Sequence, residues 1–330
     1  MDPIFEFGLE MTRYLQETFP QLEGFFKFIS SLGVEGFYLA LLPLIYWCIH
    51  KSVGKLFAYV FLLANAFNPL FKFGFRGPRP FWFDKSLMWW EESSYGVPSG
   101  HVQLATVTYL FFAGWIRRWW AWLIAVMMII FMALSRIYLG AHFPHDALVG
   151  FFIAALVLLA FVFWQRTYAK RFQKRILGQK LMVVVAVPVV YAVIFVGASL
   201  LIGEPDMSVA WAEYIPEAEL VGQKGAAAAV GMLLGAGIGL IFEGSRIRFR
   251  VDGQIWLRGL RYIVGLVVTF ALWVGLKAIF PEAPLWLAII LRVLRYFLVA
   301  LWITYYAPWF FVKAKLAEAD PEPGIDLKIS

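Results

Sequence analysis

Apolar runs of about 20 residues recur along most of this chain, and they constrain its fold more than any other feature. An α-helix of that length crosses the hydrocarbon core of a bilayer, where lipid cannot satisfy backbone hydrogen bonds. The sequence therefore predicts an all-α integral membrane protein, a multi-span helical bundle with about nine transmembrane helices. The predicted spans are 33–50, 52–72, 98–116, 118–138, 145–165, 180–202, 225–243, 258–280 and 289–312.

Composition supports lipid as the solvent for much of the surface. The chain is 62% hydrophobic and 15% charged, whereas soluble domains carry about a quarter charged residues. Its single cysteine, Cys48, excludes a disulfide framework within the chain. The net charge of +7 does not indicate a nucleic-acid partner, because the charges sit in short loops between apolar runs.

Charges in the loops predict the orientation of the chain in the membrane. One set of alternate loops is rich in basic residues, for example Lys51, Lys55, Arg246, Arg248 and Arg250. The other set is rich in acidic residues, for example Glu91, Glu92, Glu204, Asp206 and Glu213. The positive-inside bias assigns the first set to the cytoplasm, with the N-terminus outside and the C-terminus inside.

Three segments follow from this pattern. Residues 1–32 are acidic and place Phe7, Met11 and Leu15 at helical spacing, which predicts one or two amphipathic helices in the membrane surface. Residues 33–202 are the predicted core bundle, and 203–330 add further spans and a cytoplasmic tail. The small residues of 226–239 predict close helix packing, with a homodimer face as the alternative.

Three polar clusters fall at the predicted outer face, where spans begin or end. They contain Lys72, Arg76, Arg79 and Pro80; Pro98, Ser99, Gly100 and His101; and Ser135, Arg136, His142, His145 and Asp146. Lys72, Arg79 and Arg136 supply cations, and arginine offers a planar fork of donors for phosphate oxygens. Ser99 and Gly100 lie at a helix start, where free N–H groups attract anions. These clusters predict an anion cradle.

Two histidines and a carboxylate complete the set. Asp146 can accept the N–H of one His142 nitrogen and leave the other nitrogen free to attack. His101 then serves as acid and base. These residue types indicate phosphoryl transfer through a phosphohistidine, and we predict neither a metal nor a cofactor.

Lys-x6-Arg-Pro, Pro-Ser-Gly-His and Ser-Arg-x5-His-x3-Asp resemble the three-part signature of the type 2 phosphatidic acid phosphatase superfamily. That superfamily also contains glucose-6-phosphatases and vanadium haloperoxidases, and the resemblance implies their helical core. It covers 72–146 strongly and does not cover the last four spans. It implies His142 as nucleophile, Asp146 as the carboxylate that orients it, and His101 as general acid and later base. Its implied phosphate cradle is Lys72, Arg79, Ser99, Gly100 and Arg136.

Two neighbours of the signature have competing interpretations. Arg76 is either a solvated interfacial side chain or a further member of the cradle. His145 is more typical of a hydrogen-bonding neighbour than of a catalyst.

The resemblance implies a metal-independent phosphatase that hydrolyses a lipid phosphate or pyrophosphate at the extracytoplasmic face. We expect it in a bacterial cytoplasmic membrane, with its site facing the periplasm or exterior and the lipid bilayer as its partner. The motifs "SRIYLGAHFPH" and "GPRPFW" also resemble the glucose-6-phosphatase branch, so a sugar-phosphate phosphatase is the alternative. A phosphotransferase, or a lipid transporter or binding protein built on a phosphatase core, are the remaining alternatives.

Overall fold

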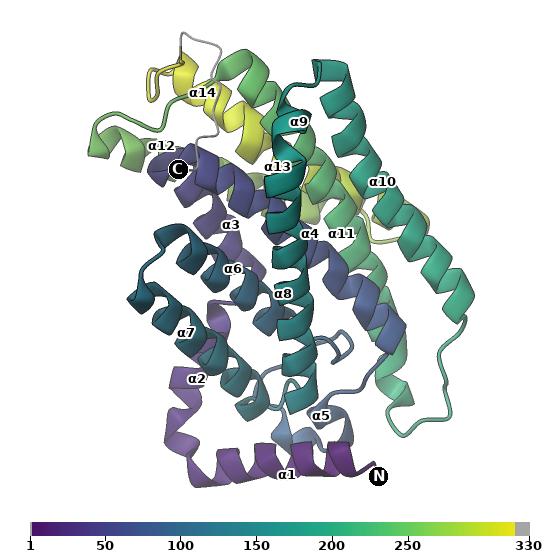
Figure 1. The fold of residues 1–330 in the computed structure, drawn as a ribbon. Helices are drawn as coiled ribbons and strands as arrows, with labels where there is room; N and C mark the ends of the chain where they lie inside the picture. Colours follow the sequence, from purple (N-terminus) through teal and green to yellow (C-terminus); the bar gives the residue numbers. More distant parts are fainter. Residues whose placement is uncertain (1, 321–330) are drawn as a thin grey trace. The chain divides into compact units, whose positions relative to one another are not determined.

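The computed structural model describes residues 2–320, which form helices joined by short loops (Figure 1). No strand occurs in this part of the chain, where one isolated bridge joins Phe249 and Ala319. The predicted all-α fold is therefore confirmed, while the end of the predicted cytoplasmic tail lies outside the described residues. The helices are α1 Pro3–Thr18, α2 Glu23–Ser31, α3 Glu35–Leu44, α4 Lys51–Phe75, α5 Pro80–Phe83, α6 Gly100–Ile116, α7 Trp119–Tyr138, α8 Pro144–Thr167, α9 Ala169–Gln173, α10 Leu177–Ile202, α11 Ile215–Phe242, α12 Ile255–Ile279, α13 Leu285–Leu301 and α14 Ala307–Lys313.

The number of spans is smaller than the predicted nine. Within residues 2–320, seven helical segments are long and apolar enough to cross a membrane, or eight if one bent pair counts as a span. That pair joins 20–31 to 35–49 at an angle of 51°. The predicted span at 98–116 forms α6, which has only 17 residues. The count of nine is therefore not confirmed, because α6 is short and the first span is broken.

The chain divides into two compact units that alternate along the sequence. Of the described residues, the first unit contains 2–37, 63–163 and 195–226, and the second contains 38–62, 164–194 and 227–320. The division falls within α3, α4, α8, α10 and α11, so these helices belong partly to each unit.

The first unit is built around the α6–α7 hairpin (Figure 1). Ile29 of α2, Val102 of α6, Met132 of α7 and Ala147 of α8 are buried in one cluster. Burial of these apolar side chains fixes where the polar ends of the helices meet.

Helices α1 and α2 form within the predicted 1–32 segment. Gln16 of α1 donates to Leu87 O at 3.0 Å and to Tyr138 O at 2.8 Å, and Thr12 donates to Ile137 O at 3.1 Å. Two of these bonds reach the carbonyl groups of Ile137 and Tyr138 in the last turn of α7, and the third reaches Leu87 in the loop before α6. One face of α1 is therefore fixed to the protein, while Phe7 on another face is exposed.

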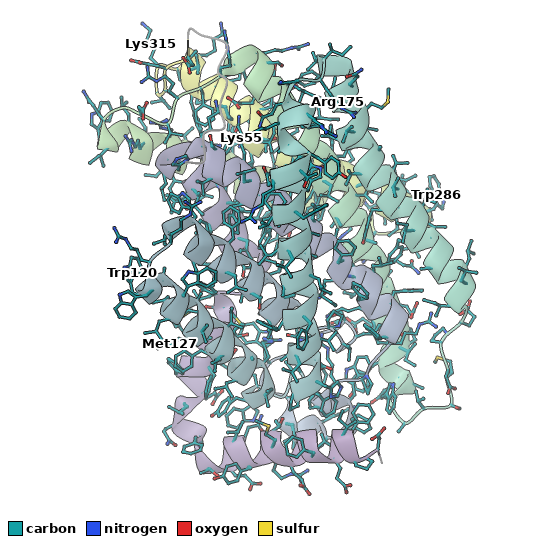
Figure 2. All side chains as sticks on the ribbon, viewed as in Figure 1. Lys55, Trp120, Met127, Arg175, Trp286 and Lys315 are labelled. Atoms are coloured by element: carbon teal, nitrogen blue, oxygen red, sulfur yellow. The ribbon has the colours of Figure 1, made fainter. Side chains whose placement is uncertain are left out.

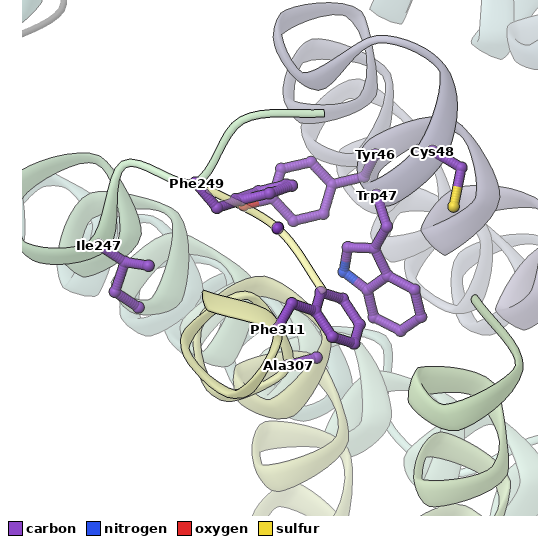
Figure 3. Packing of buried hydrophobic residues seen from close by; sticks show 8 residues of the cluster. Tyr46, Trp47, Cys48, Ile247, Phe249, Ala307 and Phe311 are labelled. Atoms are coloured by element: carbon purple, nitrogen blue, oxygen red, sulfur yellow. The ribbon is translucent and has the colours of Figure 1, made fainter. Parts of the chain in front are cut away.

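The second unit has an aromatic core. Tyr46, Trp47, Phe249 and Phe311 are buried together, and the rings of Trp47 and Phe311 meet edge to face at 5.3 Å (Figure 3). Trp47 Nε1 donates to Ile303 O at 2.9 Å, so the indole N–H is satisfied despite its burial.

Glycines let α11 approach α13 closely in the second unit. A methyl group on Gly231 would overlap the carbonyl oxygen of Val293, and one on Gly235 would overlap that of Phe297. The small residues predicted to pack helices closely are thus used within the chain at these two positions.

Large apolar side chains also point away from the helices. Figure 2 shows Trp120 and Met127 projecting outward from α7, and Trp286 of α13 is also exposed. Exposed apolar side chains on such helices are expected where lipid, and not water, surrounds the protein.

Candidate active site

All predicted catalytic and cradle residues lie in the first unit, on the ends of helices and the loops between them. Lys72 is in the last turn of α4, and Arg79 precedes α5. Ser99 precedes α6, whose first two residues are Gly100 and His101. Arg136 is in the last turn of α7, His142 is in the following loop, and Asp146 is in the first turn of α8.

The turn between α7 and α8 brings His142 to Asp146. His142 Nδ1 lies 3.2 Å from Asp146 Oδ2, which also accepts a hydrogen bond from Phe143 N at 2.9 Å. Gly140 has φ +69°, and its backbone lies so close to Leu87 O that a side chain would overlap that atom. Donation from Nδ1 to Asp146 leaves Nε2 of His142 with its lone pair.

Burial keeps His142 neutral. The side chain is almost completely buried, and this burial lowers the pKa of His142 well below its usual value of about 6.5. Arg79, Arg136 and Lys72 lower the pKa further, because a second positive charge nearby is unfavourable. The imidazole therefore holds the lone pair that a nucleophile needs at neutral pH.

Arg79 is the central cation of the site and is fully buried. Its Nε donates to Ser94 O, Nη1 donates to Ala141 O at 2.6 Å, and Nη2 donates to Tyr95 O at 3.0 Å. Nη1 also lies 3.3 Å from Nε2 of His142. The nitrogen that the sequence predicted as the nucleophile therefore faces a guanidinium whose geometry suits a phosphate oxygen.

Lys72 and Arg136 complete the cationic lining. Lys72 Nζ lies 2.7 Å from Ser94 Oγ. Arg136 donates to Ser30 Oγ through Nη1 and to Glu92 Oε1 through Nη2 at 2.7 Å. Both cations are held by groups outside the predicted signature.

His101 lies beside Glu92 and the turn after α2. Its Nδ1 is 3.9 Å from Glu92 Oε1, and its buried Nε2 has no hydrogen-bond partner within residues 2–320. A methyl group on Gly33 would overlap Cδ2 of the imidazole, so only glycine leaves the ring its place. Nε2 is therefore a buried ring nitrogen that a bound ligand could satisfy.

Two further buried polar atoms of the predicted cradle lack hydrogen-bond partners in the described part of the chain. They are Ser99 Oγ and Arg136 Nε. Buried donors in proteins are nearly always satisfied, and a bound anion would satisfy these.

Arg76 and His145, the two uncertain candidates, both contact carboxylates. Arg76 Nε binds Glu219 Oε1 at 2.9 Å, and Nη2 donates to Gly203 O at 2.8 Å. Arg76 is thus directed to the loop before α11 and to α11 itself. His145 Nε2 lies 3.2 Å from Asp146 Oδ1, and its ring stacks on Phe143.

Glu92, Ser94 and Ser30 are contacts that the sequence motifs did not reveal. Burial alone would raise the pKa of Glu92, but Arg136, Arg79, His101 and Lys72 lower it to about 2. Glu92 is therefore ionised and partly balances the three cations. Within residues 2–320, no three His, Cys, Asp or Glu side chains are grouped as a metal ion would require.

The helical fold and this site define the chain as an integral membrane protein with a cationic, two-histidine centre. Residues 54–171 match the PAP2 superfamily, and residues 227–319 match the PAP2 superfamily phosphatase transmembrane extension. The chain belongs to the PAP2 superfamily, as its signature predicted.

Curated relatives share part of the chain. Glucose-6-phosphatase catalytic subunit 1 of Rattus norvegicus is 28% identical over 188 residues, covering 46% of this chain and 50% of the relative. Sphingosine-1-phosphate phosphatase 2 of Mus musculus is 27% identical over 151 residues, covering 42% of each chain. The chain thus spans about half the length of the curated relatives it matches. No solved structure gives a significant match.

Proposed function

We propose that this protein is a metal-independent membrane phosphatase that hydrolyses a lipid phosphate or pyrophosphate through a phosphohistidine. One observation carries the proposal: Nε2 of His142 faces the buried Arg79 guanidinium at 3.3 Å, while Nδ1 is tied to Asp146 at 3.2 Å. A nucleophile, its orienting carboxylate and a cation for the phosphoryl oxygens therefore lie in one site.

Each step has a residue to perform it. Nε2 of His142 attacks phosphorus, and the phosphorus–oxygen bond to the leaving group breaks. Burial and the charge of Arg136 lower the pKa of His101 to about 3, so His101 takes up its proton together with the anionic substrate and then gives it to the leaving oxygen. His101 then takes a proton from water, whose oxygen attacks phosphorus as the nitrogen–phosphorus bond breaks. Lys72, Arg79 and Arg136 stabilise the negative charge on the phosphoryl oxygens in both steps.

The lipid substrate and the side of the membrane are parts of the proposal. Cradle residues lie at the ends of spanning helices, where a lipid headgroup is presented to water. The loop charges support an extracytoplasmic site, in a bacterial cytoplasmic membrane. A sugar phosphate is the second candidate, because several matched relatives are named glucose-6-phosphatases.

Phosphate trapping tests the mechanism. A 32P-labelled substrate quenched during turnover should leave acid-labile, base-stable label on the wild-type chain, also in EDTA. His142→Ala should carry no label, whereas His50→Ala, a histidine outside the site, should label normally. Label that forms in His142→Ala and disappears in His101→Ala would reverse the two assignments.

A substrate panel tests the lipid assignment. Phosphatidate, an isoprenyl pyrophosphate, sphingosine phosphate and glucose 6-phosphate should be compared in one detergent. We expect kcat/KM to favour a lipid. A preference for the sugar would select the second candidate without affecting the phosphohistidine.

A further inference from the structure

The second unit contains a cavity of about 340 Å³ at the start of α4 and the segment that follows α11. Its lining includes Lys51, Lys55, Arg248 and Arg250, together with Asp252 and Asp320. None of these residues belongs to the proposed catalytic set. A volume of this order suits a small ligand. We call these residues the basic cavity.

Hydrogen bonds fix the walls of the basic cavity. Lys51 Nζ donates to Phe249 O at 2.7 Å, and Phe249 N donates to Glu243 Oε1 at 3.0 Å. Asp320 N donates to Arg248 O at 2.8 Å. Behind the wall, Phe249 packs against Tyr46 (Figure 3). The cationic side chains are therefore carried by an ordered backbone, which reduces the entropy lost on binding.

The residues that line the cavity include four lysine and arginine side chains and two aspartates, and ion pairs engage three of the four cations. Glu243 is fully buried and lies 2.7 Å from both Lys51 Nζ and Lys55 Nζ, so one carboxylate balances two ammonium groups. Arg250 pairs with Asp252 at 3.0 Å. Glu318 Oε2 lies 4.0 Å from Arg250 Nη1, and Asp320 also lines the cavity.

Among residues 2–320, Arg248 is the lining lysine or arginine that forms no ion pair with a carboxylate. Its buried Nε has no hydrogen-bond partner among residues 2–320. Arg248 also has φ +50°, a left-handed conformation that is unusual for arginine. Two backbone hydrogen bonds hold this conformation: Arg248 N donates to Glu243 O, and Asp320 N donates to Arg248 O. A buried guanidinium nitrogen in a cationic cavity is a donor for an anionic ligand.

We propose that the basic cavity binds a phosphoryl group, carried by a soluble phosphate ester or by the headgroup of an anionic phospholipid. Arg248 is the main contact, and the Lys51 and Lys55 ammonium groups supply the surrounding field. The loop charges predict that this site faces the cytoplasm, whereas the proposed catalytic site faces outward. Binding here is independent of the catalytic proposal.

Lys55 provides a reporter for occupancy, because its side chain is 27% exposed and lines the cavity (labelled in Figure 2). The rate of reductive methylation of Lys55 should be followed by mass spectrometry in the purified full-length protein. One arm adds inorganic phosphate, with chloride at equal ionic strength as reference. The other compares phosphatidylcholine nanodiscs with and without phosphatidylglycerol. We expect slower modification in at least one arm, and the arm identifies the source of the phosphoryl group.

Two arginine substitutions make the test specific. Arg248→Asn tolerates the left-handed backbone and should raise the ligand concentration for half-protection about tenfold or more. Arg246→Asn changes a neighbouring exposed arginine outside the cavity and should leave protection unchanged. Absence of protection in both arms with wild-type protein would overturn the proposal, and so would equal protection in the two variants. The wild-type result does not depend on how either variant folds.

Discussion

The two histidines of the site differ in what their ring nitrogens face. His142 is held between Asp146 and Arg79, whereas Nε2 of His101 is buried without a partner among the described residues. His101→Ala should therefore impair the first step in proportion to the basicity of the leaving group. We expect a loss of about 100-fold or more for an alkyl phosphate and a much smaller loss for nitrophenyl phosphate. Burst-phase kinetics would measure it, and equal losses for both substrates would contradict the acid role.

Glu92 affects stability through Arg136. Replacing it in Glu92→Gln removes the charge that faces the buried guanidinium, and we expect a loss of about 1–3 kcal/mol at pH 7. Because the pKa of Glu92 is lowered to about 2, its contribution is complete above the unfolded value of about 4.3 and is lost as pH falls from there toward 2.

Denaturant unfolding of the wild type and Glu92→Gln in detergent, at pH 7 and near pH 3, measures this difference. The gap between the two proteins should narrow at the lower pH. A gap that is constant with pH would mean that the charge of Glu92 is not the cause.

Sequence motifs predicted the site residues whose roles depend on fixed spacing. His142 and Asp146 are four residues apart across a proline-started helix, which brings one side chain to the other. Ser94 and Glu92 lie in an irregular loop with no periodicity, so only the fold shows that they face Lys72 and Arg136. The sequence left two interpretations of Arg76 open, and its contact with Glu219, distant along the chain, appears only in the fold.

At the scale of helices, the contact between α11 and α13 requires glycine. Gly235→Ala would place a methyl group against the backbone of Phe297, and overpacking of this kind costs about 1–3 kcal/mol. Gly275→Ala on α12 is the matched control, because its methyl group would meet nothing within 4 Å. Thermal unfolding in detergent should show a lower midpoint only for Gly235→Ala. Equal midpoints would show that α11 and α13 can move apart at this contact without a loss of stability.

The helices lie where the sequence predicted them, and the count of nine spans is not confirmed for a local reason. Apolar periodicity marks the segment that forms α6, but its polar first turn carries His101, and the helix ends at Arg117 in a left-handed conformation. The length of α6 is therefore set by the residues at its two ends, and a hydropathy profile does not show where a helix begins and ends. The sequence also could not show that α1 packs on the protein, since Gln16 contacts carbonyl groups that are distant along the chain.

At the scale of the whole molecule, membrane orientation is the property that remains a prediction. Loop charges place Glu91 outside and Arg175 in the cytoplasm. Both side chains are exposed, so single cysteines there, in a Cys48→Ala background, would be accessible to an impermeant maleimide. Sealed right-side-out cells should label Glu91→Cys and spare Arg175→Cys. The opposite pattern would place the candidate site in the cytoplasm.

The bonds between α1 and the end of α7 also have a consequence for biosynthesis. Thr12 and Ile137 are separated by 125 positions, yet they are hydrogen-bonded in the finished protein. A ribosome makes α1 first, and its partners appear only after several later segments have entered the translocation machinery. Helix α1 therefore cannot form its hydrogen bonds to α7 until these later segments have been inserted. Ser30 contacts Arg136 and Gly33 packs against His101, so the candidate site can be completed only after α7 has been synthesised.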